Sequence, residues 1–477
     1  MTDSQVLAPT GKQTTTAFEE LRAFMRERQG NRAAVTDFET FEREARRRFA
    51  AAEAEFVALE LARLDVDAPA VEIDGVPHRR VLRCPQTYMT AAGPFSIERA
   101  LYSTRQDGER AVCPMEFRAG VVEGYFTPLA AQNAAWAVAH LTPGEAETLF
   151  ARVGGMCPSK ASLDRLPKAM SARWEADRER FERRLRSQER VPACAVTVAV
   201  SLDGVLVPMK DGRGQEKRAA TRARGVVAKG PAGYSEASCG TLTFYDGLGL
   251  PLGTRRLARM PESGKATLKA SLALELARVL AQRPDLRVVT IADGANDNWA
   301  FLCELPEGRA GYQIVDFFHA AEHLAEAMVV VHGEGTVPFH REFEKYRHIL
   351  RHDTDGVEKV IRHLRYLVDK YPRNHKLRTT VGYFRHRRHR MRYAQFARRH
   401  LPIGSGIVEA ACKTLVTQRL KRSGMRWRHD GGQAILTLRA WEQSDRFDRA
   451  WRMLAATYVK TVCLPDGIVD IASRRPR

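Results

Sequence analysis

The chain has 477 residues, 44% of them hydrophobic and 28% charged, which is ordinary for a folded protein of two to four domains. Lys and Arg number 76 against 57 Asp and Glu, giving a formal net charge of +19 and a pI near 9.8. This excess favours a polyanionic partner, above all nucleic acid. No apolar run is long enough to cross a bilayer, the first residues lack signal-peptide character, and the eight cysteines form no CxxC pair. We therefore expect a cytoplasmic protein with reduced thiols and no membrane partner.

Residues 1–66 are predicted to be a flexible leader followed by an amphipathic helix. Between Asp37 and Leu64 apolar residues recur at helical spacing among many charges: Phe38, Phe41, Ala45, Phe49, Phe56 and Leu59. Such a helix packs on a neighbouring element or on a second copy of itself. Residues 67–125 contain short strands interrupted by Asp-Gly and Gly-Pro turns, which predicts a small β module.

Residues 126–190 have a helical pattern. Three segments, "PLAAQNAAWAVAHL", "TPGEAETLFARVGG" and "PSKASLDRLPKAM", each begin at or near a proline, and Thr142 before Pro143 is a good helix cap. Three short helices with a glycine turn are compatible with a helix-turn-helix that binds DNA. They are equally compatible with an ordinary three-helix core.

Residues 191–320 are predicted to form most of a mixed α/β domain. The pattern gives three strands in hairpin succession, a helix, a strand, a second helix and a last strand, "AGYQIVDFFH". In that order the first and fourth strands are neighbours. Each is expected to end in Asp-Gly, at Asp203-Gly204 and Asp293-Gly294, so the two aspartates should lie side by side.

Two adjacent carboxylates repel unless a cation lies between them, and a hard divalent metal ion is the economical partner. A third carboxylate is expected, and the basic region offers one. Between Tyr371 and Arg428 there are sixteen Lys and Arg and a single acid, Glu409. Residues 401–425 are predicted to carry Glu409 on a helix capped by Ser405, with Val408, Ala411 and Leu415 packed on the sheet. The surrounding cations are predicted to hold DNA: Lys413, Arg419, Lys421 and Arg422.

Residues 321–400 are predicted to be a basic helical insertion, because 116 positions separate Asp293 from Glu409. Its last helix carries five arginines predicted to bind the DNA backbone, together with Tyr383, Phe384, Tyr393 and Phe396: Arg385, Arg387, Arg388, Arg390 and Arg392. A basic helix that is merely solvated is the alternative. Residues 426–477 should form C-terminal helices and a tail.

The three acids resemble the catalytic triad of DDE transposases, which have an RNase H-like domain: Asp203 in "SLDG", Asp293 in "IADGANDNW" and Glu409 in "GSGIVEAACK". "DFFHAAEHL", "GSGIVEAACKTLVTQRLKRSGMRW" and "PSKASLDRLPK" are similar to blocks of the ISKra-type insertion-sequence transposases in the Mutator-like group. The Asp-x-x-His of Asp316 to His319 also resembles a Mutator-like motif. The resemblance spans about residues 17–462.

The resemblance implies an enzyme that cuts at the terminal inverted repeats of a mobile element and joins the 3′ ends to target DNA. Both steps are in-line displacements at phosphorus, to which two Mg²⁺ or Mn²⁺ ions held by Asp203, Asp293 and Glu409 are suited. A homodimer or larger synaptic complex, associated with the bacterial nucleoid, is implied as well.

Several alternatives stay open from the sequence. His319 is either an active-site residue or a core or capping histidine. Lys413 touches a phosphate or only pairs with Glu409 one turn away. The basic loop at 210–230 closes on DNA or has no role. The whole chain could instead be a non-catalytic DNA-binding protein derived from a transposase, although such a protein would be free to lose an acid and all three are present.

Overall fold

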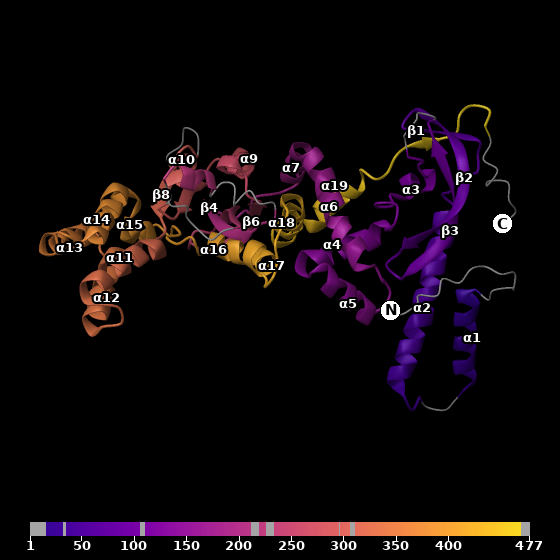
Figure 1. The fold of residues 1–477 in the computed structure, drawn as a ribbon, viewed down its shortest axis with the longest axis horizontal. Helices are drawn as coiled ribbons and strands as arrows, with labels where there is room; N and C mark the ends of the chain where they lie inside the picture. The colour runs from indigo at the N-terminus through magenta and orange to yellow at the C-terminus, as the bar shows by residue number, and fades with distance from the viewer. Residues whose placement is uncertain are drawn as a thin grey trace. The chain divides into compact units, whose positions relative to one another are not determined.

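The structure, a computed structural model, describes residues 16–31, 35–104, 110–210, 219–225, 233–294, 296–305 and 311–468. The chain forms two compact units, one of Met1–Met170 with Trp451–Arg477 and the other of Ser171–Ala450 (Figure 1). The predicted leader, residues 1–15, and most of the predicted loop at 210–230 lie outside the described residues. None of the described helices is both long and apolar enough to cross a membrane.

The first unit begins with two helices that pack side by side, α1 (Ala17–Gly30) and α2 (Phe38–Ala62). The predicted amphipathic helix is confirmed as α2. Helix α1 was not predicted, although its start has a clear sequence signal. The Thr16 hydroxyl accepts from the Glu19 backbone N–H at 3.2 Å, and the Glu19 carboxylate accepts from the Thr16 N–H at 2.9 Å. This capping box satisfies two N–H groups at the helix terminus.

An antiparallel sheet follows, as the pattern of short strands and turns predicts. Its strand order is β3-β2-β1-β9, from β1 (Ala70–Ile73), β2 (Val76–Met89), β3 (Pro94–Ser103) and β9 (Val462–Cys463). Asp74 and Gly75 both have positive φ, which suits the tight turn between β1 and β2. Strand β9 comes from the C-terminal segment, where only helices and a tail were expected. Besides α1 and α2, this unit contains α3 (Pro114–Ala119), α4 (Pro128–His140), α5 (Pro143–Val153), the start of α6 (Lys160–Ala176) and the end of α19 (Phe447–Ala455).

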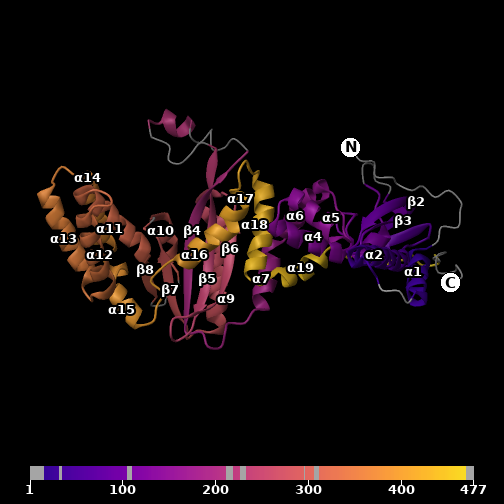
Figure 2. The same cartoon turned by 90° about the horizontal axis from the view of Figure 1, so that it is seen from below.

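The second unit contains a five-stranded mixed sheet of order β6-β5-β4-β7-β8 (Figure 2). The strands are β4 (Thr197–Pro208), β5 (Tyr234–Tyr245), β6 (Pro251–Arg259), β7 (Arg287–Ala292) and β8 (Tyr312–Val315). Strands β4, β5 and β6 are antiparallel, whereas β7 is parallel to β4 and β8 is parallel to β7. The predicted mixed α/β class is confirmed, and the first and fourth strands are neighbours as expected.

The two faces of this sheet bury different helices because successive side chains of β4 point to opposite sides. Leu202 shares a core with Leu268 and Leu272 of α9 (Ala266–Gln282). Val207 belongs to a separate core with Val408 and Leu415, which follow the sheet much later in the chain. Val205 and Val207 of β4 therefore face the segment that carries Glu409. The predicted packing of Val408, Ala411 and Leu415 on the sheet is confirmed.

A helical segment separates β8 from the Glu409 segment. It comprises α11 (Phe317–His332), α12 (Val337–His352), α13 (Gly356–Lys370), α14 (His375–Arg387), a 3₁₀ turn η2 (Arg388–Arg390) and α15 (Tyr393–Arg398). The single long helix expected at its end is therefore wrong, since the chain turns between α14 and α15. Phe384, Tyr393 and Phe396 are at most 6% exposed, so their rings form core and not the nucleic-acid surface expected of them. The Tyr393 hydroxyl donates to the Val315 carbonyl at 2.9 Å.

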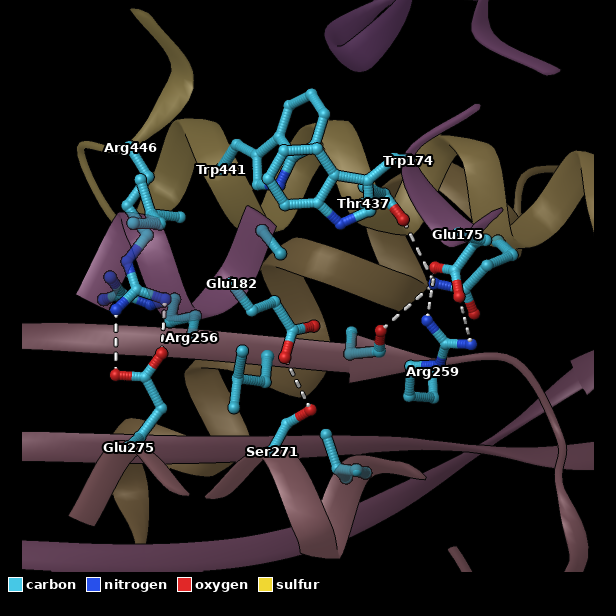
Figure 3. Close-up of a pocket in the computed structure, with 16 residues that line it drawn as sticks. Trp174, Glu175, Glu182, Arg256, Arg259, Ser271, Glu275, Thr437, Trp441 and Arg446 are labelled. Atoms are coloured by element: carbon cyan, nitrogen blue, oxygen red, sulfur yellow. Dashed lines mark hydrogen bonds and ion pairs between the residues drawn. The ribbon is translucent and has the colours of Figure 1, made fainter. Parts of the chain in front are cut away.

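A buried ion network joins four elements of the second unit, and two of its members, Glu275 and Arg446, line a small pocket (Figure 3). Arg446 contacts the Glu275 carboxylate at 2.9 Å and the Glu189 carboxylate at 2.6 Å. Arg255 of β6 contacts the same two carboxylates, at 3.0 Å from Glu275 and 3.1 Å from Glu189. All four residues are at most 7% exposed. The paired charges compensate one another, and they link the segment after α7 (Arg178–Ser187) to β6, α9 and the segment after α18 (His429–Gln443).

Candidate active site

Asp203 lies on β4, and Asp293 directly follows the neighbouring strand β7. Strands β4 and β7 are parallel, and Ser201 is the Cα partner of Ile291. Asp203 and Asp293 each come two residues after this pair. The register therefore brings both to the edge of the sheet at which the shorter strand β7 has ended. The expected strand end at Asp203 is wrong, however. Strand β4 continues to Pro208, because β5 keeps pairing with it up to Tyr234.

Asp203 points to the face that carries Glu409. Its Oδ2 lies 3.5 Å from the Cys412 Sγ, one helical turn beyond Glu409, and its Oδ1 accepts the Gly204 N–H at 2.7 Å. Burial raises the pKa of the Asp203 carboxyl, and the negative charge of Asp293 adds to this. The hydrogen bonds from Gly204 and Cys412, and the charge of His319, oppose the rise in pKa without cancelling it. Asp203 is thus a carboxylate whose surroundings favour a compensating positive charge.

Asp293 sits in a loop held from both sides. The Asn298 amide lies 3.4 Å from Asp293 Oδ1, and the Trp299 indole N–H donates to the Asp293 carbonyl at 2.6 Å. On the other side, Arg387 donates to the Gly294 carbonyl at 2.6 Å. Gly294 is required here because a Cβ would come within 2.4 Å of the Tyr383 ring. The inserted helices therefore contribute to the position of Asp293.

Glu409 lies on the short helix α16 (Gly406–Ala411), with its side chain 46% exposed. The predicted helix start at Ser405 is confirmed, because Ser405 occupies the N-cap position, but its side chain makes no capping hydrogen bond. Instead, its hydroxyl donates to Glu409 Oε1 at 2.8 Å. The His319 Nε2 lies 3.7 Å from the same oxygen, and the His319 Nδ1 lies 3.1 Å from Glu322. His319 is 37% exposed, so it lies at the site and not in the core.

Asp316 connects these segments, and it is completely buried. Its Oδ1 accepts the His319 backbone N–H at 2.8 Å, and its Oδ2 accepts the Ser405 backbone N–H. Burial lowers the pKa of His319, but the charges of Asp316, Glu322, Glu409 and Asp293 outweigh burial and leave that pKa raised. Asp316 was not among the predicted site residues. The sequence signal was the Asp-x-x-His motif, in which Asp caps the helix that presents His319.

Metal-type ligands approach one another most closely at this point. Within the described ranges, Asp316, His319 and Glu409 form a group whose ligand atoms all lie within 4.8 Å of one another. Asp203 and Asp293 are outside that group. Both Asp316 oxygens accept backbone N–H groups, whereas the Glu409 and His319 side chains are 46% and 37% exposed.

The helix carrying Glu409 changes its winding directly after it. Cys412–Thr417 is a π-helix, followed by α17 (Gln418–Leu420). A π-helix shifts the hydrogen-bond ladder by one residue and is frequent near functional sites. Arg439 of α18 donates to the Leu415 carbonyl at 3.0 Å and also to the Thr414 carbonyl. Arg439 is 5% exposed, so a buried guanidinium satisfies carbonyl groups of the irregular turn.

The predicted DNA-binding residues fall into two groups. Six of the nine side chains are exposed: Lys413, Lys421, Arg422, Arg385, Arg388 and Arg392. The other three, Arg387, Arg390 and Arg419, are engaged within the protein. Arg390 donates to Gln313 at 2.9 Å and lies 4.0 Å from the Trp299 ring centre. Arg419 is 2% exposed and lies 5.4 Å from the Trp427 ring centre, which leaves it no surface for a phosphate.

No protein-family model matches the chain, and no curated protein sequence matches it. Among solved structures, the chain is similar to the Drosophila P element transposase strand transfer complex. The match covers 74% of this chain and 86% of that chain at 10% sequence identity, with a TM-score of 0.25. At these values the similarity is distant.

Proposed function

We propose that this protein is a DNA transposase of an insertion sequence, and that Asp203, Asp293 and Glu409 are its catalytic carboxylates. The observation that carries the proposal is the register of the parallel strands β4 and β7, in which Asp203 and Asp293 each come two residues after the paired Ser201 and Ile291. Glu409 would join the same arrangement, because Cys412, one turn after it, contacts Asp203. In addition, the sequence blocks around the three acids resemble those of ISKra-type transposases.

The donor set fits divalent metal ions. Carboxylate oxygens are the ligands that Mg²⁺ and Mn²⁺ prefer. Burial and the charge of Asp293 raise the pKa of Asp203, and a cation bound beside this carboxylate would offset both effects. Two such ions would activate the attacking oxygen and stabilise the leaving oxygen at a phosphodiester. Asp203 and Asp293 would hold the ions from the sheet, and Glu409 would hold them from the helix. Ser405 would fix the Glu409 rotamer through its 2.8 Å hydrogen bond.

The exposed cations would bind the DNA backbone. Lys413 lies one turn beyond Glu409, and Lys421 and Arg422 follow the same helical segment. Three further exposed arginines lie close in sequence to Arg387, which donates to the Gly294 carbonyl in the loop that carries Asp293: Arg385, Arg388 and Arg392. Phosphate contacts from these side chains would position a duplex without reading its sequence. The proposed reaction is cleavage at terminal inverted repeats, followed by transfer of the 3′ ends to target DNA within a complex of at least two subunits.

The test uses purified full-length protein and a plasmid carrying the coding sequence with its flanking DNA. Parent protein should nick or cut the plasmid near the element ends with Mg²⁺ or Mn²⁺, and chelation should stop the reaction. Asp203→Asn, Asp293→Asn and Glu409→Gln should each abolish cleavage but keep binding to the same DNA. Asp297→Asn, an exposed acid close to Asp293, is the matched control and should cleave normally. Binding without metal-dependent cleavage by the parent would favour a non-catalytic DNA-binding protein instead.

A further inference from the structure

Helix α2 of the α1–α2 hairpin exposes three phenylalanines, although the Phe56 ring also contacts the Phe18 ring of α1 at a centroid distance of 6.4 Å. Phe38, Phe49 and Phe56 of α2 are 60%, 53% and 53% exposed. They stand eleven and seven residues apart, and both spacings return to nearly the same side of an α-helix. Three phenylalanines on one side of one helix form a stripe, and a contiguous apolar stripe on the surface of a folded domain marks a contact surface.

Little of the hairpin is buried where it extends from the rest of its unit. The buried residues of α2 are Ala52, Ala54 and Leu61, so its first fourteen residues, 38–51, contain none. Helix α1 buries only Leu21 among its described residues. Most helical stability comes from packing of an apolar face and not from helix propensity. Two long helices that bury so little require a further surface to pack on.

Charges beside Phe49 indicate what that surface is. Arg46 precedes Phe49 by three residues and Glu53 follows it by four, so both flank the ring on the same face. Within the described residues neither Arg46 nor Glu53 forms an ion pair, whereas Arg43, Arg47 and Arg48 pair within α2. When two copies of such a face meet antiparallel, the cation of each copy lies opposite the anion of the other, so the face is complementary to itself.

We propose that α2 is a self-association surface, on which a second copy of the chain packs antiparallel with its two-fold axis at Phe49. In this arrangement the two Phe49 rings meet at the axis. Arg46 of each copy lies within about one residue of the position opposite Glu53 of the other copy, a rise of about 1.5 Å along the helix. The contact is isologous, as expected for a two-fold dimer, and the two hairpins together make a four-helix arrangement. The proposal does not depend on the catalytic role of the chain.

The first test measures the mass of the full-length protein by light scattering across a dilution series. Phe49→Ser should raise the dimer dissociation constant by at least about tenfold, since each dimer then buries two fewer aromatic rings. Leu248→Ser is the matched control, because Leu248 is 70% exposed but lies in the second unit. Its dissociation constant should equal that of the parent. A monomeric parent, or a Phe49→Ser dimer of unchanged affinity, would overturn the proposal.

The second test fixes the orientation by exchanging the two charges. Arg46→Glu and Glu53→Arg should each weaken the dimer, and the double variant should recover most of the parental affinity. The Arg46 side chain also lies beside Gly154, so a local change there could contribute to the effect of the first single variant. Recovery by the double variant separates that local change from the pairing between copies. A double variant weaker than both single variants would refute the antiparallel pairing.

Discussion

The carboxylate of Asp316 accepts the backbone N–H of Ser405, a residue that lies 89 positions later in the chain. The same carboxylate accepts the His319 N–H, and the Phe317 N–H donates to the Ile403 carbonyl at 2.9 Å. Gly404 lies in this contact, where a Cβ would come within 3.0 Å of the Phe318 ring. Asp316 therefore joins the helix that presents His319 to the segment that leads into Glu409.

Replacing Asp316 by Asn should destabilise the protein and displace Glu409. The amide keeps only one acceptor oxygen, so a buried backbone N–H loses its partner at a cost of about 1–3 kcal/mol. Urea denaturation should show this loss in the free energy of unfolding, and metal-dependent cleavage should fall even where the protein is fully folded. Asp369→Asn, at an exposed position of α13, should match the parent in both measurements. Full stability and activity of Asp316→Asn would contradict the positioning role.

The buried ion network should make the free energy of unfolding decrease as the pH falls into the acidic range. Burial raises the pKa of Glu275, but Arg446 and Arg255 outweigh burial, so the pKa of this carboxyl lies below its usual value. Its stabilisation is complete above the pKa of an unfolded Glu, about 4.3, and is lost as the pH falls through the folded value. Glu275→Gln should lower the free energy of unfolding by about 3–5 kcal/mol near neutral pH, because the two buried arginines then share one carboxylate, that of Glu189, and one buried positive charge is uncompensated.

The pH profile distinguishes this network from the general acid sensitivity of the fold. Urea denaturation of the Glu275→Gln variant should show a smaller loss of stability between about pH 5 and pH 3 than that of the parent. Glu334→Gln, at an exposed position, should keep the parental profile. A Glu275→Gln variant that loses as much stability on acidification as the parent would show that Glu275 does not titrate as expected.

The arginines around the turn between α14 and α15 should separate into two functions. Neutralising Arg385, Arg388 and Arg392 together should weaken binding to specific and random duplexes by similar factors. It should flatten the log–log salt dependence by up to about 0.9 for each phosphate that is no longer neutralised. Titration of one duplex at several salt concentrations measures this slope.

Arg387 and Arg390 provide the comparison, because their guanidinium groups hold the Gly294 carbonyl and the Gln313 side chain. Their replacement by Gln should lower the melting temperature and change the salt slope less than the triple variant does. If the triple variant keeps the parental slope, the proposed binding of the DNA backbone by the exposed arginines is wrong.

Arg439 should be necessary for the π-helix after Glu409. Arg439→Met would leave the Thr414 and Leu415 carbonyls without this donor, at about 1–3 kcal/mol each. Arg439→Lys should lie between the parent and Met, because an ammonium group lacks the planar fork that reaches both carbonyls. Chemical denaturation of the three proteins gives the ranking. If the Arg439→Met variant is as stable as the parent, the π-helix is stabilised by its own packing and not by Arg439.

The sheet order was predictable because strands, turns and helices alternate clearly between residues 192 and 318. Asp203 and Asp293 were predicted to be neighbours because each precedes a glycine after a buried run, although Gly204 lies inside β4 and not in a turn. Long-range pairing was not accessible in the same way. Strand β9 has only two residues and is defined by pairing with β1, far away in the sequence. Helix-capping propensity also did not predict that the Ser405 hydroxyl would donate to Glu409 instead of making a capping hydrogen bond.

The basic region shows a second limit of sequence reasoning. Composition identifies an excess of arginine but not which guanidinium groups face water. Arg419 has the same side chain as Arg422, and yet Arg419 is buried beside Trp427 whereas Arg422 is exposed. The break between α14 and α15 was missed for a related reason. Tyr393 and Phe396 are drawn into the core next to β8, and tertiary packing outweighs the helical pattern.

The hydrogen bond between the Phe317 N–H and the Ile403 carbonyl has a consequence for how such a chain changes over evolutionary time. The inserted segment begins after Phe317 and ends before Ile403. Because these two residues are joined by a backbone hydrogen bond, both ends of the segment are held together. Loop-closure entropy grows only slowly with the length of the enclosed chain. Descendants of this protein could therefore lengthen, shorten or exchange the outer helices α12 and α13 while the path into Glu409 stays the same.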